Sequence, residues 1–78
     1  MRELVEFLVR ALVAEPDSVR VEEVAENGDV VLEVRVAQSD LGRVIGKEGR
    51  VANAIRTIAK AAATAEGGGR VMVEIVED

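Results

Sequence analysis

The sequence predicts an α+β fold whose elements follow the order helix, strand, strand, short helix, long helix, strand. Three observations carry this prediction. Two segments repeat apolar residues at helical spacing, alternating valine runs flank Asn27-Gly28 and recur near the end of the chain, and glycines separate the two later helices. The 78 residues suffice for one small domain, which we place at residues 1–78.

The first helix is predicted over Arg2 to Ala14, because apolar residues recur there at helical spacing. Pro16 lies just beyond this segment and disfavours helix at Glu15. The predicted core stripe of this helix consists of Leu4, Val5, Leu8, Ala11 and Leu12, with Phe7 as a core position at its edge.

The two following strands are predicted to form a hairpin. Val19 and Val21 alternate with charged residues, and Asn27-Gly28 is the dipeptide that type I′ turns favour, since both central residues need a positive φ. On the returning strand one face is formed by Val30, Leu32, Val34 and Val36. The last strand alternates in the same way through Val71, Val73 and Ile75.

The two later helices are delimited by capping and glycine signals. Ser39 is the expected N-cap of a short helix from Asp40 to Ile45, and a long helix begins after Gly49 and ends at the glycines 67–69. The apolar face predicted for the long helix comprises Val51, Ala54, Ile55, Ile58, Ala59 and Ala62.

The composition argues against an enzyme. The chain has no cysteine and no histidine, so it lacks thiolate chemistry and the usual general base near neutral pH. Its two serines, Ser18 and Ser39, have no base to activate them, and its acidic residues are scattered. We therefore expect no catalytic residue, metal, cofactor or small-molecule substrate. The apolar runs are too short to span a membrane and no signal peptide is recognised, which favours a cytoplasmic protein.

The stretch Gly46-Lys47-Glu48-Gly49 is the candidate functional site. Glycine lets the backbone turn sharply and lets a ligand approach without a Cβ atom in the way. The loop opens into the long helix, whose free N–H groups and dipole favour an anion, and Lys47 adds a positive charge. The ligand that such a site suits is a phosphate, or the phosphates of a nucleic-acid backbone.

The charge distribution supports this interpretation locally. The net charge is −5, yet residues 43–60 contain five basic residues and one acidic residue, while the segments on both sides are net acidic. Two of the basic residues, Arg56 and Lys60, lie one turn apart on the long helix, and the simpler interpretation of both is a solvated surface. The alternative function is a protein-interaction subunit with weak or vestigial RNA contact, which the acidic surface and Glu48 favour.

The run VIGKEGR, in this order of elements, resembles the type II KH domain, whose signature is VIGxxG. The similarity extends over ELVEFLVRAL, the whole central run and VMVEIVED to the small bacterial KH-domain proteins of the KhpA family. The resemblance implies a three-stranded sheet with helices packed on one face. It also implies a non-catalytic protein that binds single-stranded RNA, acts as an RNA chaperone or post-transcriptional regulator, and takes part in cell-shape and cell-wall control.

KH domains hold about four nucleotides, with the GxxG loop clamping the backbone. Carried onto this sequence, the clamp is Gly46, Lys47, Glu48 and Gly49, with Arg43 and Arg50 neutralising phosphates and Asn53 contacting RNA. Ile45, Val51 and a residue of the second strand, Val34 or Val36, would line the groove under the bases, although plain core packing also explains Ile45 and Val51. Because a carboxylate repels phosphate, we expect Glu48 to weaken binding.

The resemblance further implies a partner, since members pair with a second KH-domain protein, KhpB or Jag. A single groove should bind weakly, and linking two grooves raises the effective affinity. We therefore expect a homodimer, or a heterodimer with a KhpB/Jag-type protein.

Overall fold

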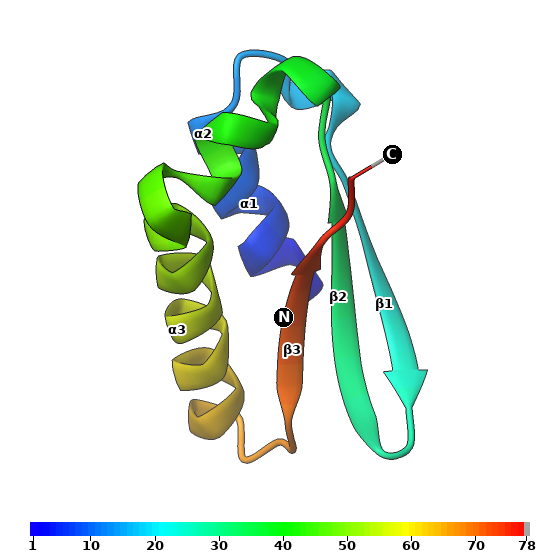
Figure 1. Ribbon diagram of the computed structural model, residues 1–78. Helices are drawn as coiled ribbons and strands as arrows, with labels where there is room; N and C mark the ends of the chain where they lie inside the picture. Colours follow the sequence, from blue (N-terminus) through cyan, green and yellow to red (C-terminus); the bar gives the residue numbers. More distant parts are fainter. Residues whose placement is uncertain (78) are drawn as a thin grey trace.

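A three-stranded sheet carries the α-helices on one of its faces (Figure 1). The computed structural model describes residues 1–77. The elements are α1 (Arg2–Leu12), β1 (Arg20–Glu26), β2 (Asp29–Arg35), α2 (Leu41–Ile45), α3 (Arg50–Ala65) and β3 (Val71–Ile75). Short 3₁₀ turns at Pro16–Ser18, Gln38–Asp40 and Lys47–Gly49 connect them. The predicted α+β class, element order and one-sided helical layer are confirmed.

The sheet has the order β1-β2-β3, with β1 antiparallel and β3 parallel to β2. Asn27 and Gly28 both have positive φ, 51° and 84°, so the predicted hairpin turn is confirmed. The turn fixes the register in which Val21 lies opposite Val34, and Val34 lies opposite Ile75 on the other side. This register directs the predicted valine faces of all three strands toward the helices.

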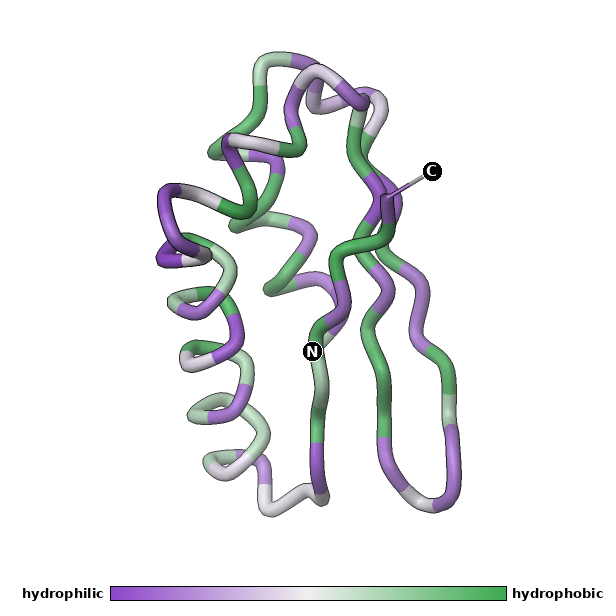
Figure 2. Tube along the Cα trace, in the orientation of Figure 1, coloured by the Kyte–Doolittle hydropathy of each residue, from purple (hydrophilic) through white to green (hydrophobic). Residues whose placement is uncertain are grey.

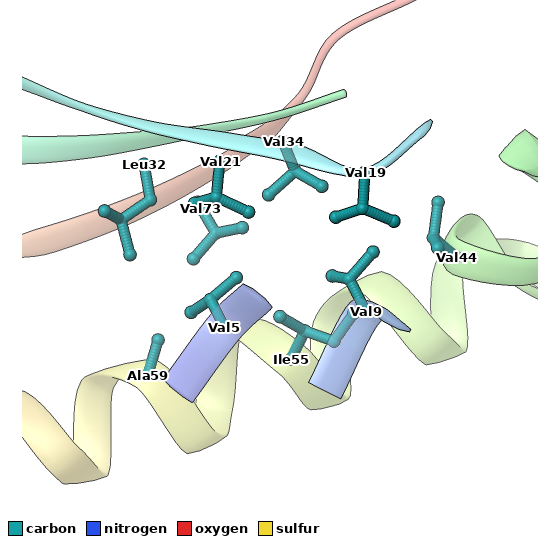
Figure 3. Packing of buried hydrophobic residues seen from close by; sticks show 10 residues of the cluster. All are labelled: Val5, Val9, Val19, Val21, Leu32, Val34, Val44, Ile55, Ala59 and Val73. Carbon is teal, nitrogen blue, oxygen red and sulfur yellow. The ribbon is translucent and has the colours of Figure 1, made fainter. Parts of the chain in front are cut away.

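The core lies between that face of the sheet and the helices α1 and α3 (Figure 3). Valines dominate it, together with Leu32, Ile55 and Ala59, and Val44 closes it from α2. Figure 2 shows hydrophobic and hydrophilic residues alternating along the strands, whereas the connection from α2 to α3 is mostly hydrophilic. Among residues 1–77, no helix combines the length and apolar character needed to cross a bilayer.

The predicted core faces of both long helices were partly wrong. On α1 the buried residues are Val5 and Val9, whereas Phe7 is 70% exposed and Leu12 is 40% exposed. On α3 the buried face is Ala52, Ile55, Ala59 and Ala63, so the predicted Ala54 and Ile58 lie exposed beside it. Each helix carries a broad apolar surface, and the core uses one edge of the predicted face, through Val5 on α1 and through Ile55 and Ala59 on α3.

The end of α1 and the start of α2 also differ from the prediction, for a shared reason. The carboxylate of Asp40, which is 1% exposed, accepts the backbone N–H groups of Ala14 and Glu15 at 3.0 Å each. Those N–H groups therefore leave the helix, and α1 ends at Leu12 rather than Ala14. Ser39 does not cap α2, since its hydroxyl donates to Glu15 at 3.2 Å and α2 begins only at Leu41.

Candidate nucleic-acid interface

The Gly46–Gly49 loop turns back tightly against the start of α3. Gly46 has φ 75° and ψ 173°, a region that is essentially restricted to glycine. A Cβ atom at this position would stand 2.5 Å from Cγ2 of Val51 and 2.8 Å from its backbone nitrogen. Glycine is therefore required at residue 46 both by its backbone angles and by the proximity of α3.

The other end of the loop is open. Gly49 has φ 76°, and the nearest atom to a Cβ placed there is Nδ2 of Asn53, at 4.0 Å. Gly49 donates its N–H back to Gly46 at 3.2 Å, and Arg50 donates to Lys47, which closes one 3₁₀ turn. Among residues 1–77, the backbone N–H groups of Lys47 and Glu48 meet no hydrogen-bond acceptor. The loop tip therefore presents backbone N–H groups that can donate hydrogen bonds to an anion.

Glu48 is held in an unusual conformation at the loop tip. Its φ of 58° and ψ of 25° lie in the left-handed region, which a residue with a Cβ atom rarely adopts. Its carboxylate lies 3.5 Å from the Arg50 guanidinium, and both side chains are largely exposed. This intramolecular pair places a negative charge where the sequence predicted phosphate binding.

The basic residues predicted to attract phosphate differ in whether a carboxylate already pairs with them. Arg43 pairs through Nε with the buried Asp40 at 3.2 Å, and 60% of its side chain remains exposed. Lys47 is exposed and, within residues 1–77, forms no ion pair. Lys47 is therefore the fully available charge of the loop, while Arg43 and Arg50 each share theirs with a neighbouring carboxylate.

Asn53 lies one turn into α3, next to the open side of the loop. Its Oδ1 accepts a hydrogen bond from Nη1 of Arg56 at 3.1 Å, and Nε of Arg56 donates to the Val73 carbonyl at 3.1 Å. Arg56 is half-buried and links α3 to β3, so its interpretation as a merely solvated side chain was wrong. No short-range signal in the sequence indicates this contact, because Val73 lies 17 residues away.

The apolar residues predicted for the groove fall into two groups. Ile45, Val51 and Val36 are half-buried and pack against the rim of the core, so each retains surface that a ligand could contact. Val34 is 1% exposed and belongs to the core. Val36, predicted as part of the second strand, lies just beyond the end of β2 and is half-buried. Within residues 1–77, no cluster of His, Cys, Asp or Glu side chains is arranged to hold a metal ion.

A second surface feature was missed by the sequence analysis. An apolar hollow lies between α1 and α3 on the exposed side of both helices. It is lined by Leu8, Ala11, Leu12, Arg50, Val51, Ala54, Ile55 and Ile58, which we call the α1–α3 hollow. The sequence nevertheless contained a signal for the hollow. Both helices have more apolar residues than one core face can bury, so some of them had to form an apolar surface elsewhere. The hollow shares Arg50 and Val51 with the loop region, so the two features adjoin.

Comparison with known proteins agrees with the fold. The model of the family described as KhpA/KhpB, KH domain, matches residues 2–75. The chain is 49% identical over 76 residues to "RNA-binding protein KhpA" of Clostridium perfringens, covering 97% of this chain and 100% of that protein. A protein of the same name from Caldanaerobacter subterraneus is 50% identical over 76 residues, with the same coverage.

A solved structure shares the fold at low sequence identity. The crystal structure of Era in complex with MgGDPNP and nucleotides 1506–1542 of 16S ribosomal RNA superposes with a TM-score of 0.65 at 22% identity. The match covers 99% of this chain and 30% of Era, so the chain spans about a third of that protein's length. The likeness concerns the fold alone.

Proposed function

Because the chain belongs to the KhpA/KhpB family of KH domains, we propose that it binds single-stranded RNA through the Gly46–Gly49 loop. The family is non-catalytic, in agreement with the expectation that the chain is not an enzyme. The observation that carries the proposal is the combination at the loop tip. Within residues 1–77, the backbone N–H groups of Lys47 and Glu48 meet no acceptor, Lys47 is exposed without an ion pair, and the Asn53 amide lies beside the open Gly49 end of the loop.

The chemistry of this combination suits a sugar-phosphate backbone better than a single small anion. The donors extend from the loop into the first turn of α3, and the half-buried side chains of Ile45 and Val51 lie beside them. A phosphate on the loop would place the neighbouring bases against these aliphatic side chains. Since they provide no base-specific hydrogen bonds, we expect weak binding with little sequence preference.

We further propose that the active form contains two KH domains. The α1–α3 hollow exposes Leu12 and Ile58, at 40% and 42%, on a domain whose core is small. Paired face to face with a second copy of this chain, the hollow would bury its apolar side chains on both sides. Because Arg50 lines the hollow, each loop would lie beside the interface of such a dimer, and an RNA long enough to reach both loops would bind more tightly by avidity.

The cellular role is proposed from the family resemblance. On that resemblance we propose a second KH-domain protein of the KhpB/Jag type as the heterologous partner. With it, the protein would act in the cytoplasm as an RNA chaperone or post-transcriptional regulator in cell-shape and cell-wall control.

Binding of a short unstructured single-stranded RNA, measured by fluorescence anisotropy over a range of salt concentrations, tests the RNA step. Lys47→Gln should weaken binding and reduce the slope of log K against log salt by about 1, since one phosphate contact is lost. Lys60→Gln is the matched control, because Lys60 is an exposed lysine about 15 Å further along α3 from its first residue.

Gly49→Asp adds a negative charge where the nearest atom to the added Cβ is 4.0 Å away, so it should abolish binding. The left-handed φ of 76° costs some stability, but aspartate tolerates this region better than most residues, so circular dichroism should still show a folded protein. Gly46→Asp is unsuitable for this purpose, because any side chain there collides with Val51. Equal binding by the wild type and both loop variants, or no binding by any of them, would overturn the proposal and favour the protein-interaction subunit.

A further inference from the structure

Arg56 is a half-buried arginine on α3 that bonds both to β3 and to Asn53, whose amide lies beside Gly49. Its guanidinium donates through Nε to the Val73 carbonyl of β3 at 3.1 Å. It donates through Nη1 to Oδ1 of Asn53, three residues earlier on the helix, at 3.1 Å. The contact with β3 fixes the guanidinium, and the guanidinium in turn holds the Asn53 side chain.

The chemistry of arginine decides which end of the Asn53 amide faces it. A guanidinium has N–H donors and no acceptor, so only the amide oxygen can bond to it. The oxygen and nitrogen of an asparagine amide are nearly equal in size, and packing alone does not distinguish the two orientations. The hydrogen bond from Arg56 therefore selects the orientation in which Nδ2 points away from it.

In the selected orientation, the nitrogen end of the Asn53 amide is the end that lies beside the loop. Nδ2 of Asn53 is the nearest atom to the space beside Gly49 that a Cβ would fill, at 4.0 Å. The NH₂ group of Asn53 thus lies beside the open end of the loop, where it can donate to a ligand. The reversed amide would present its oxygen there, and an oxygen repels the phosphate and sugar oxygens of a nucleic-acid backbone, which act as acceptors.

We propose that Arg56 is a positioning residue for RNA binding, because it holds the Asn53 amide with its N–H donors toward a backbone oxygen of RNA lying against Gly49. This inference rests on the proposed RNA binding and adds to it a specific role for a side chain that makes no contact with the RNA.

The amide orientation is tested first on the free protein. The wild type should show nuclear Overhauser effects between the Asn53 side-chain NH₂ protons and the Gly49 α protons. Arg56→Lys retains the positive charge but not the planar fork that bonds both Val73 and Asn53, so these effects should weaken or disappear. If they are absent in the wild type, or unchanged in Arg56→Lys, the inference is overturned without reference to RNA.

The second arm is a double-mutant cycle on the affinity for a short single-stranded RNA. Loss of one hydrogen bond predicts that Asn53→Ala weakens binding about 3- to 10-fold. Arg56→Lys should weaken it by a similar factor, and adding Asn53→Ala to Arg56→Lys should cause little further loss. Additive losses would show that Arg56 acts independently of Asn53 and would overturn the inference.

A third variant separates orientation from stability. In Asn53→Asp one carboxylate oxygen can still accept from Arg56, so the fold should persist, but the other oxygen faces the loop and binding should fall more than 10-fold. Thr57→Asp is the matched control, since it adds the same charge one turn later on α3 at another exposed position. Equal losses for the two aspartates would contradict the positioning role.

Absence of RNA binding by the wild type would overturn the proposed function, and the positioning role with it, whereas binding with an additive cycle would overturn the positioning role alone.

Discussion

The backbone of Gly46 lies so close to Val51 that a single added carbon at Gly46 would stand 2.5 Å from the valine Cγ2 atom. This contact, rather than flexibility, explains the first glycine of the loop. It holds the chain leaving α2 against the first turn of α3, and so directs Lys47 and Glu48 outward. The second glycine has a different role, because open space surrounds it.

Because Val51 crowds Gly46 while no atom lies near a Cβ at Gly42, alanine should change the stability differently at these two positions. Gly46→Ala should destabilise the protein by about 1–3 kcal/mol, since both the left-handed backbone and the Val51 contact oppose a side chain. Gly42→Ala lies in α2 with no atom near its added Cβ and should be neutral or stabilising by up to about 1 kcal/mol. Urea denaturation of both variants measures the contrast. Equal stabilities would contradict the account of Gly46.

Glu48→Gln should tighten RNA binding at low salt. The change removes a carboxylate from the clamp and frees Arg50, whose guanidinium lies 3.5 Å from it. The stability should hardly change, because exposed ion pairs of this kind contribute about 0–1 kcal/mol. Anisotropy titrations of wild type and variant measure the effect, with the exposed Glu66→Gln as a control for net charge. Unchanged or weaker binding by Glu48→Gln would count against phosphate at this position.

The loop and the hairpin could be predicted from sequence because each follows from a local rule. Asn27-Gly28 satisfies the positive φ of a type I′ turn, and alternating valines leave one register that buries them. The glycines at 46 and 49 likewise mark backbone angles that other residues avoid. Such rules depend on a few adjacent residues, so they hold before any tertiary contact is known.

The faces of the helices could not be predicted in this way. α3 has two adjacent apolar stripes, one through Ala52 and Ile55 and the other through Ala54 and Ile58. Hydrophobicity favours the stripe with Ile58, but the small side chains of Ala52, Ala59 and Ala63 occupy the buried face against the sheet. Only the tertiary arrangement decides between the stripes. The contacts of Arg56 and Asp40 were unpredictable for the same reason, since their partners are distant in the sequence.

Asp40→Asn should destabilise the fold although it removes no volume. The carboxylate accepts hydrogen bonds from two backbone N–H groups at 3.0 Å and forms an ion pair with Arg43 at 3.2 Å, and asparagine would turn an NH₂ group toward one of the backbone donors. An unsatisfied buried donor predicts a loss of about 1–3 kcal/mol in the free energy of unfolding. The exposed Asp17→Asn in the neighbouring turn is the control. A loss no larger than that of Asp17→Asn would show that Asp40 does not hold the end of α1 to α2.

Ile58→Asp should separate dimerisation from folding. Ile58 is 42% exposed on the α1–α3 hollow, so a carboxylate there remains solvated in the monomer but would be buried in a face-to-face dimer. Analytical ultracentrifugation should show the wild type as a dimer and the variant as a folded monomer. Affinity for a short RNA that fills one groove should stay the same, while affinity for an RNA long enough to reach two grooves should fall at least 10-fold as avidity is lost.

Met72→Asp is the matched control, because Met72 is equally exposed, at 43%, on β3, outside the residues that line the hollow. If the wild type is monomeric at high concentration, or if Met72→Asp dissociates the dimer as Ile58→Asp does, the hollow is not the surface through which two copies pair.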